Sequence, residues 1–97
     1  MDASAVAVKM NHKLERVVSN IRNATLKLQE SRLSAEERTK EERRICIESS
    51  LAVSDLSTES DIGALKSVLS EAQQSVEDEF VALEVRNRIA ELDVQCL

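Results

Sequence analysis

Proline is absent from this chain of 97 residues, which has one glycine, Gly63, and one aromatic residue, Phe80. Proline and glycine are the usual residues of tight turns, so their scarcity predicts long elements with few turns. Aromatic rings supply much of the buried area of compact cores, so their near absence argues against a typical globular core. A single glycine also excludes a glycine-rich loop that binds phosphate.

Cysteine and histidine are equally scarce, with Cys46, Cys96 and His12 as the full set. The two cysteines lie fifty residues apart and do not make a disulfide framework. A closed zinc site takes four Cys or His ligands in close spacing, and a Cys–His nucleophile pair needs a pocket that slender helical pairs rarely form. We therefore expect a protein that is not an enzyme and has no cofactor, no metal and no small-molecule substrate.

Long apolar runs are missing as well. No run approaches the ~20 residues of a membrane-spanning helix, and the start of the chain lacks the basic region of a secretory signal. We expect no membrane partner and a cytoplasmic or nuclear location.

Helix-forming residues and mixed charges fill the chain instead, with 32% of the residues charged, which is typical of coiled coils and long helices. Apolar residues spaced by alternating steps of four and three form one seam over residues 10–28, which another helix must cover. Similar spacing resumes at Ile62. We expect these seams to form an oligomer interface made of Met10, Leu14, Val17, Ile21, Leu28, Leu65, Leu69, Val76, Phe80 and Leu83.

The spacing changes near the C-terminus of the second seam. Ala72, Val76 and Phe80 follow one another by two steps of four, like a coiled-coil stutter. Beyond Phe80 the apolar face widens, which indicates contact with more than one neighbouring helix. The last third of the chain therefore resembles a member of a three- or four-helix arrangement.

Element boundaries are weakly marked. Residues 1–4 are expected to fray, 5–56 to form one long helix with a basic first part and a charged spacer at 36–44, 57–61 to form a turn, and 62–97 to form an acidic coiled-coil helix. Ser34 with Glu37 matches a capping box, as does Thr58 with Asp61. The first box either starts a new helix or lies inside the long one, and the lack of glycine or proline there favours continuity.

These patterns predict an all-α, oligomeric fold of long coiled-coil helices, either an antiparallel helical hairpin or a near-continuous rod that pairs with other chains. Residues 1–50 carry a net charge of +2 and residues 51–97 a net charge of −7. The basic segment 9–32 and the acidic segment 71–93 suit each other as antiparallel partners, within one chain or between two.

Three functions are compatible with the predicted coiled-coil fold. The first is a structural scaffold, cytoskeletal in type, that mediates homo- or hetero-oligomerisation through helical seams. The second is a coiled coil that binds microtubules or nucleic acid through a basic face made of Lys9, Lys13, Arg16 and Lys27. The third is a regulator that sequesters a partner's helix. Aromatic residues do not interleave with the basic ones, so stacking on single-stranded nucleic acid lacks its platform.

Overall fold

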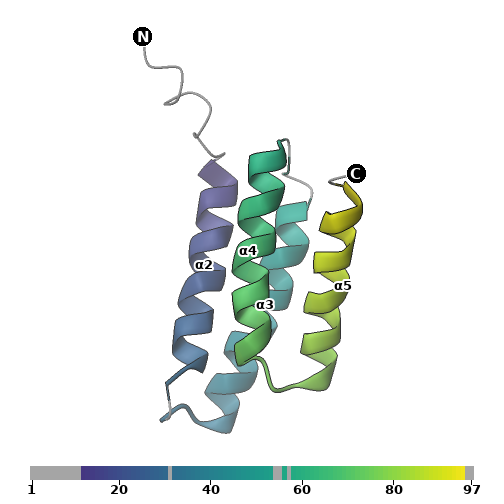
Figure 1. Ribbon diagram of the computed structural model, residues 1–97. Helices are drawn as coiled ribbons and strands as arrows, with labels where there is room; N and C mark the ends of the chain where they lie inside the picture. The colour runs from purple at the N-terminus through teal and green to yellow at the C-terminus, as the bar shows by residue number, and fades with distance from the viewer. Residues whose placement is uncertain (1–11, 31, 54–55, 57, 96–97) are drawn as a thin grey trace.

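A computed structural model of the chain describes residues 12–30, 32–53, 56 and 58–95, which contain four helices and no strand (Figure 1). The helices are α2 (His12–Leu28), α3 (Ala35–Val53), α4 (Glu59–Ser75) and α5 (Glu79–Gln95). The all-α prediction is confirmed. The Cα atoms extend over 50 × 27 × 18 Å, whereas a helix of fifty residues would span about 75 Å. The chain is therefore a compact bundle, and the near-continuous rod is wrong.

Successive helices run in opposite directions, so that α2 lies parallel to α4 and α3 lies parallel to α5 (Figure 1). Helix α2 packs against α3 and α4, and α5 packs against the same two helices from the other side. Within the described residues α2 and α5 do not touch, and they form opposite edges of the bundle. None of these helices is long and apolar enough to cross a membrane.

The apolar seams are covered from within the chain. Leu14 and Ile21 of α2 are fully buried, as are Leu65 and Leu69 of α4. A helix with a single apolar face is marginal in water by itself, so folding back stabilises every helix at once. The buried apolar residues form one core, made of Leu14, Val17, Val18, Ile21, Ala24, Leu28, Ile45, Ala52, Ile62, Leu65, Val68, Leu69, Ala72, Val85 and Leu92.

The single helix expected over residues 5–56 is instead two helices. Helix α2 ends at Leu28, and α3 begins at Ala35 after a capping box. Ser34 Oγ accepts a hydrogen bond from the Glu37 backbone N–H at 3.2 Å and donates one to Glu37 Oε1 at 2.9 Å. The box therefore starts a new helix, because the break lets α3 fold back over the seam of α2, which a continuous helix would leave exposed.

The helix expected over residues 62–97 is also divided. Thr58 is the N-cap of α4, and its hydroxyl accepts from the Asp61 backbone N–H at 3.1 Å. Helix α4 ends at Ser75 with Val76 extended, and Asp78 then accepts from the N–H groups of Phe80 and Val81 at 2.8 and 3.3 Å. The two successive steps of four in the sequence bracket this second break.

The expected pairing of the basic segment 9–32 with the acidic segment 71–93 is not formed between α2 and α5. Helix α5 holds Glu79, Glu84, Glu91 and Asp93, and it lies on the far edge of the bundle from α2. Apolar packing decides which helices touch, because exposed charge pairs contribute only ~0–1 kcal/mol each. Residues 1–4, Met10 and Lys9 lie outside the described residues, as does residue 57 of the expected turn.

Candidate functional site

A polar cluster joins three helices at the end of the bundle that holds both breaks. Arg38 of α3 donates to the carbonyl of Leu28 at 3.3 Å and to the carbonyl of Ser75 at 2.7 Å. These carbonyls end α2 and α4, which run parallel, so one guanidinium satisfies unpaired acceptors of two helix C-termini. Arg38 Nε also lies 3.3 Å from Glu42 Oε2 and 3.1 Å from Glu77 Oε2.

Glu42 completes this cluster from one turn further along α3. Its carboxylate is buried and accepts hydrogen bonds from the backbone N–H groups of Glu77 and Asp78, each at 3.1 Å. These donors lie where α5 starts, at which point a helix has unpaired N–H groups and favours a negative charge. The cluster thus ties the ends of α2 and α4 and the start of α5 to α3.

Glu41 is buried beside it but faces α2. Its carboxylate lies 3.8 Å from Lys27 Nζ and 3.4 Å from Arg44 Nε. Residues 36–44, the predicted charged spacer, form the first half of α3. Most of them are at least partly exposed, but Glu41 and Glu42 are buried and hold neighbouring elements in place.

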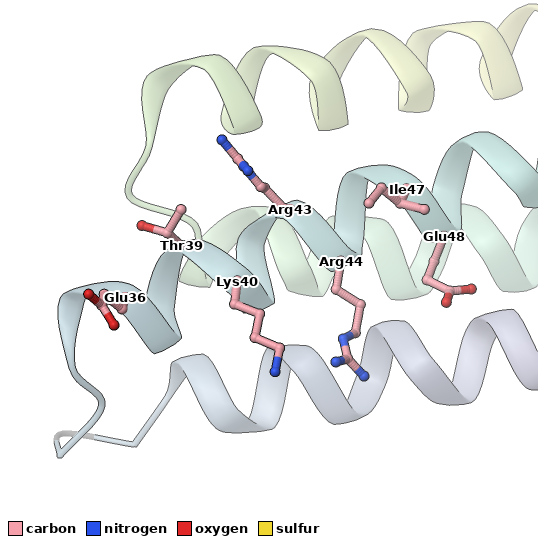
Figure 2. A pocket seen from close by; sticks show the side chains of 7 residues that line it. All are labelled: Glu36, Thr39, Lys40, Arg43, Arg44, Ile47 and Glu48. Atoms are coloured by element: carbon pink, nitrogen blue, oxygen red, sulfur yellow. The ribbon is translucent and has the colours of Figure 1, made fainter.

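The exposed side of α3, which is flanked by α2 and α5, carries a groove of about 490 Å³ that is lined by residues of α3 alone (Figure 2). In Figure 2 Lys40 and Arg44 point toward α2, and Arg43 points toward α5. Lys40 and Arg43 have no hydrogen bond or ion pair with any described residue. We call this feature the α3 groove, and its lining residues are Glu36, Thr39, Lys40, Arg43, Arg44, Ile47 and Glu48.

Apolar side chains continue the α3 groove toward the C-terminal end of α3. Ile47 is 59% exposed, and Leu51, one turn further on, is 57% exposed. The surface of α3 is thus basic in its middle and apolar at one end. A groove with that pattern suits an amphipathic helix that carries both apolar and acidic side chains.

The face of α5 that points away from the core carries a further row of five side chains, four of which are apolar. Its positions alternate by steps of three and four, as in a coiled-coil seam, and all are exposed. Phe80 is 82% exposed, Leu83 53% and Val94 68%. We call this the α5 outer row, and it consists of Phe80, Leu83, Asn87, Ala90 and Val94.

The predicted oligomer interface separates into two parts in the structure. Leu14, Val17, Ile21, Leu28, Leu65 and Leu69 are buried in the chain's own core, and Val76 is half-buried against it. Phe80 and Leu83 are exposed on the α5 outer row. The helical spacing of the sequence assigns these two residues to the same seam as Leu65 and Leu69, because the spacing does not indicate the break at residues 76–78.

The predicted basic face is also divided. Lys13 and Arg16 are exposed near the start of α2, whereas Lys27 lies at the other end and pairs with the buried Glu41. Lys9 lies outside the described residues. One of the four predicted residues, Lys27, therefore helps to hold the fold together. The α3 groove brings together a different basic set, which lies within the predicted spacer 36–44.

The side chains considered for catalysis or metal binding, His12 and Cys46, lie on different helices. His12 is exposed at the start of α2, 3.7 Å from Glu15, and Cys46 is half-buried on α3. Burial raises the pKa of the Cys46 thiol, and the negative charge of Glu84 raises it further. The described part of the chain holds no group of three or more His, Cys, Asp or Glu side chains placed to bind a metal ion.

Comparison of the chain with protein-family models, characterised proteins and solved structures found no match.

Proposed function

We propose that this protein is a non-enzymatic scaffold module that joins protein assemblies through the α5 outer row. The observation that supports this function is the exposure of Phe80, Leu83 and Val94 on a helix whose opposite face lies in the core. Apolar side chains gathered on one helical face are the usual anchors of helix-to-helix recognition. The seam of α2 is already covered by the chain itself, so the α5 outer row is the surface with the spacing for a further helix.

The test compares the size of native assemblies in cells of the source organism. A tagged chain is expressed, and its complexes are sized by gel filtration without denaturant. The row variant combines Phe80→Glu with Leu83→Glu, and the matched control is Leu26→Glu. Leu26 is 57% exposed on α2 and lies outside the row, so the control places a similar charge on a similarly exposed apolar site.

The wild type and the control should elute in an assembly larger than one chain, and the row variant should elute as a single folded chain. Circular dichroism checks that each variant keeps its helices. An assembly that is unchanged in the row variant, or a wild type that elutes alone, would overturn the proposal.

The other two predicted functions can be distinguished from the scaffold function by experiment. Binding to microtubules or nucleic acid would use the described residues of the predicted basic face, Lys13, Arg16 and Lys27, which are all exposed on α2. Co-sedimentation at rising salt tests it, and charge reversal at Lys13 and Arg16 would abolish such binding. A regulator that sequesters a partner's helix would instead form a heterocomplex more stable than any self-assembly.

A further inference from the structure

We propose that the α5 outer row and its acidic flank dock in the α3 groove of a second copy of this chain, with the docked helix antiparallel to α3. The proposal rests on the scaffold function above and names one partner for the same row. It is argued from the match in charge, apolar anchors and length between two surfaces of one molecule.

The α3 groove has a net positive charge, with three cations and two carboxylates in its lining, and the α5 outer row has carboxylates on its flank. Lys40 and Arg43 lie in the α3 groove without a partner in the described chain. Beside the α5 outer row, Glu84 is exposed and forms no ion pair with another described residue, and among those residues Glu91 is bonded by Arg88 alone, at 3.0 Å. Bringing these groups together would place two carboxylates near two cations that the single chain leaves without partners.

The spacing along the two helices sets the direction. Phe80 and Glu91 are eleven positions apart on α5, and Lys40 and Leu51 are eleven positions apart on α3. When the helices run antiparallel, Phe80 lies over Leu51 while Glu91 lies over Lys40, each pair about 16 Å from the other at ~1.5 Å per residue. A parallel arrangement with Phe80 over Leu51 would carry the acidic residues past Val53, where α3 ends.

A two-fold axis perpendicular to the helices generates this direction. Helices α3 and α5 of one chain are parallel (Figure 1), and the groove lies on the side of α3 that α2 and α5 flank (Figure 2). Such an axis makes the α5 helix of the second copy antiparallel to α3 and forms two equal contacts, which closes the dimer.

Pairing of the α5 outer row with the same row of a second copy fits less well. In an antiparallel pair centred on Asn87, Glu84 of each chain would face Glu91 of the other. Glu79 would likewise face Asp93. Like charges beside a seam oppose pairing, whereas the α3 groove places Lys40 opposite Glu91 and Arg43 one turn from the position opposite Glu84.

The test is a charge exchange read out as molecular mass by light scattering over a range of concentrations. The groove variant combines Lys40→Glu with Arg43→Glu, and the row variant combines Glu84→Lys with Glu91→Lys. Each variant alone places like charges in both contacts of the dimer. The mixture of the two variants places opposite charges in both contacts. Glu71→Lys on the exposed side of α4 is the control, because Glu71 lies in neither surface.

The wild type and the control should pass from one chain to two as concentration rises. Each charge variant should dissociate at least about tenfold more readily, and an equimolar mixture should recover the wild-type mass. A wild type that stays a single chain at all concentrations overturns the proposal, as does a mixture that fails to recover while both variants remain helical. If larger assemblies in cells still depend on Phe80 and Leu83, the scaffold function stands while the second copy is excluded as partner.

Discussion

Removing the carboxylate of Glu42 should destabilise the whole bundle. In the native chain this buried group accepts two backbone hydrogen bonds, from Glu77 and Asp78, and lies 3.3 Å from Arg38. Glu42→Ala leaves both backbone N–H groups without their acceptor and removes one of the two carboxylates beside Arg38, at a buried position. Breaking one side of a buried ion pair costs about 3–5 kcal/mol. A domain of this size has about 5–15 kcal/mol of stability, so the loss is a large fraction of the total.

Urea denaturation followed by circular dichroism measures this free energy of unfolding. Glu42→Gln keeps the size and one acceptor oxygen but loses the charge, so it should cost less, about 1.5–3 kcal/mol. Combining Glu42→Ala with Arg38→Met should cost less than the sum of the single changes by roughly 0.5–3 kcal/mol, because the two groups interact. Glu71→Gln, at an exposed position, is the control and should stay within about 0.5 kcal/mol of wild type. A loss below 0.5 kcal/mol for Glu42→Ala would refute the role given to this carboxylate.

Three further changes test the core, a helix interior and a thiol. Leu69→Ala should lower the free energy of unfolding by about 2–5 kcal/mol because Leu69 is fully buried, whereas Leu26→Ala at an exposed site should change it by under about 0.5 kcal/mol in the same urea titration. Gly63→Ala should raise the melting temperature, with a gain of about 0.5–1 kcal/mol, because α4 is helical there and the added Cβ would meet no atom within 4 Å beyond its chain neighbours and the local helix backbone; a lower melting temperature would contradict this. The raised pKa of Cys46 means that alkylation, measured in a Cys96→Ser background, should be slower in the folded chain than in urea at mildly alkaline pH; equal rates would show that burial does not protect the thiol.

The raised pKa of Cys46 also makes the free energy of unfolding depend on pH. Folding favours the neutral Cys46 thiol, so this contribution is complete below the ordinary thiol pKa and is lost as the pH rises through the folded value. The chain should therefore unfold more easily at strongly alkaline pH, and Cys46→Ala should reduce that dependence.

Helix type and buried faces could be predicted from the sequence because they depend on neighbours three and four positions apart. Leu14, Ile21, Leu65 and Leu69 stand in such patterns, and all four are fully buried. The capping box at Ser34 is equally local, but no glycine or proline accompanies it, so the sequence favours a continuous helix there. Two hydrogen bonds of one serine are enough to start a new helix because the fold-back buries a seam.

The second break and the polar cluster were harder to predict because their causes are distant in the sequence. Asp78 is a possible N-cap in sequence terms, but it stands in an acidic run that also suits a helix interior. Its use as a cap coincides with a carboxylate at Glu42, thirty-six residues earlier, that accepts its N–H. The α5 outer row shares this origin, since Phe80 would continue the buried seam of α4 if α5 did not begin afresh at residue 79.

Apolar and charged residues thus contribute differently to the fold of this chain: apolar residues drive helix packing, and two charged residues select one arrangement. The apolar seams drive the helices to pack together, but leucine and valine contacts alone permit several arrangements of four short helices. Arg38 contacts the C-terminal ends of α2 and α4, whereas the helix end that Glu42 contacts is the start of α5, so this pair distinguishes the helices by direction as well as by position. If that is so, a chain with Arg38→Met and Glu42→Leu should stay helical yet show less dispersed amide signals in nuclear magnetic resonance spectra, because more than one packing becomes populated. Signals as well dispersed as those of the wild type would show that the apolar pattern suffices to select the arrangement.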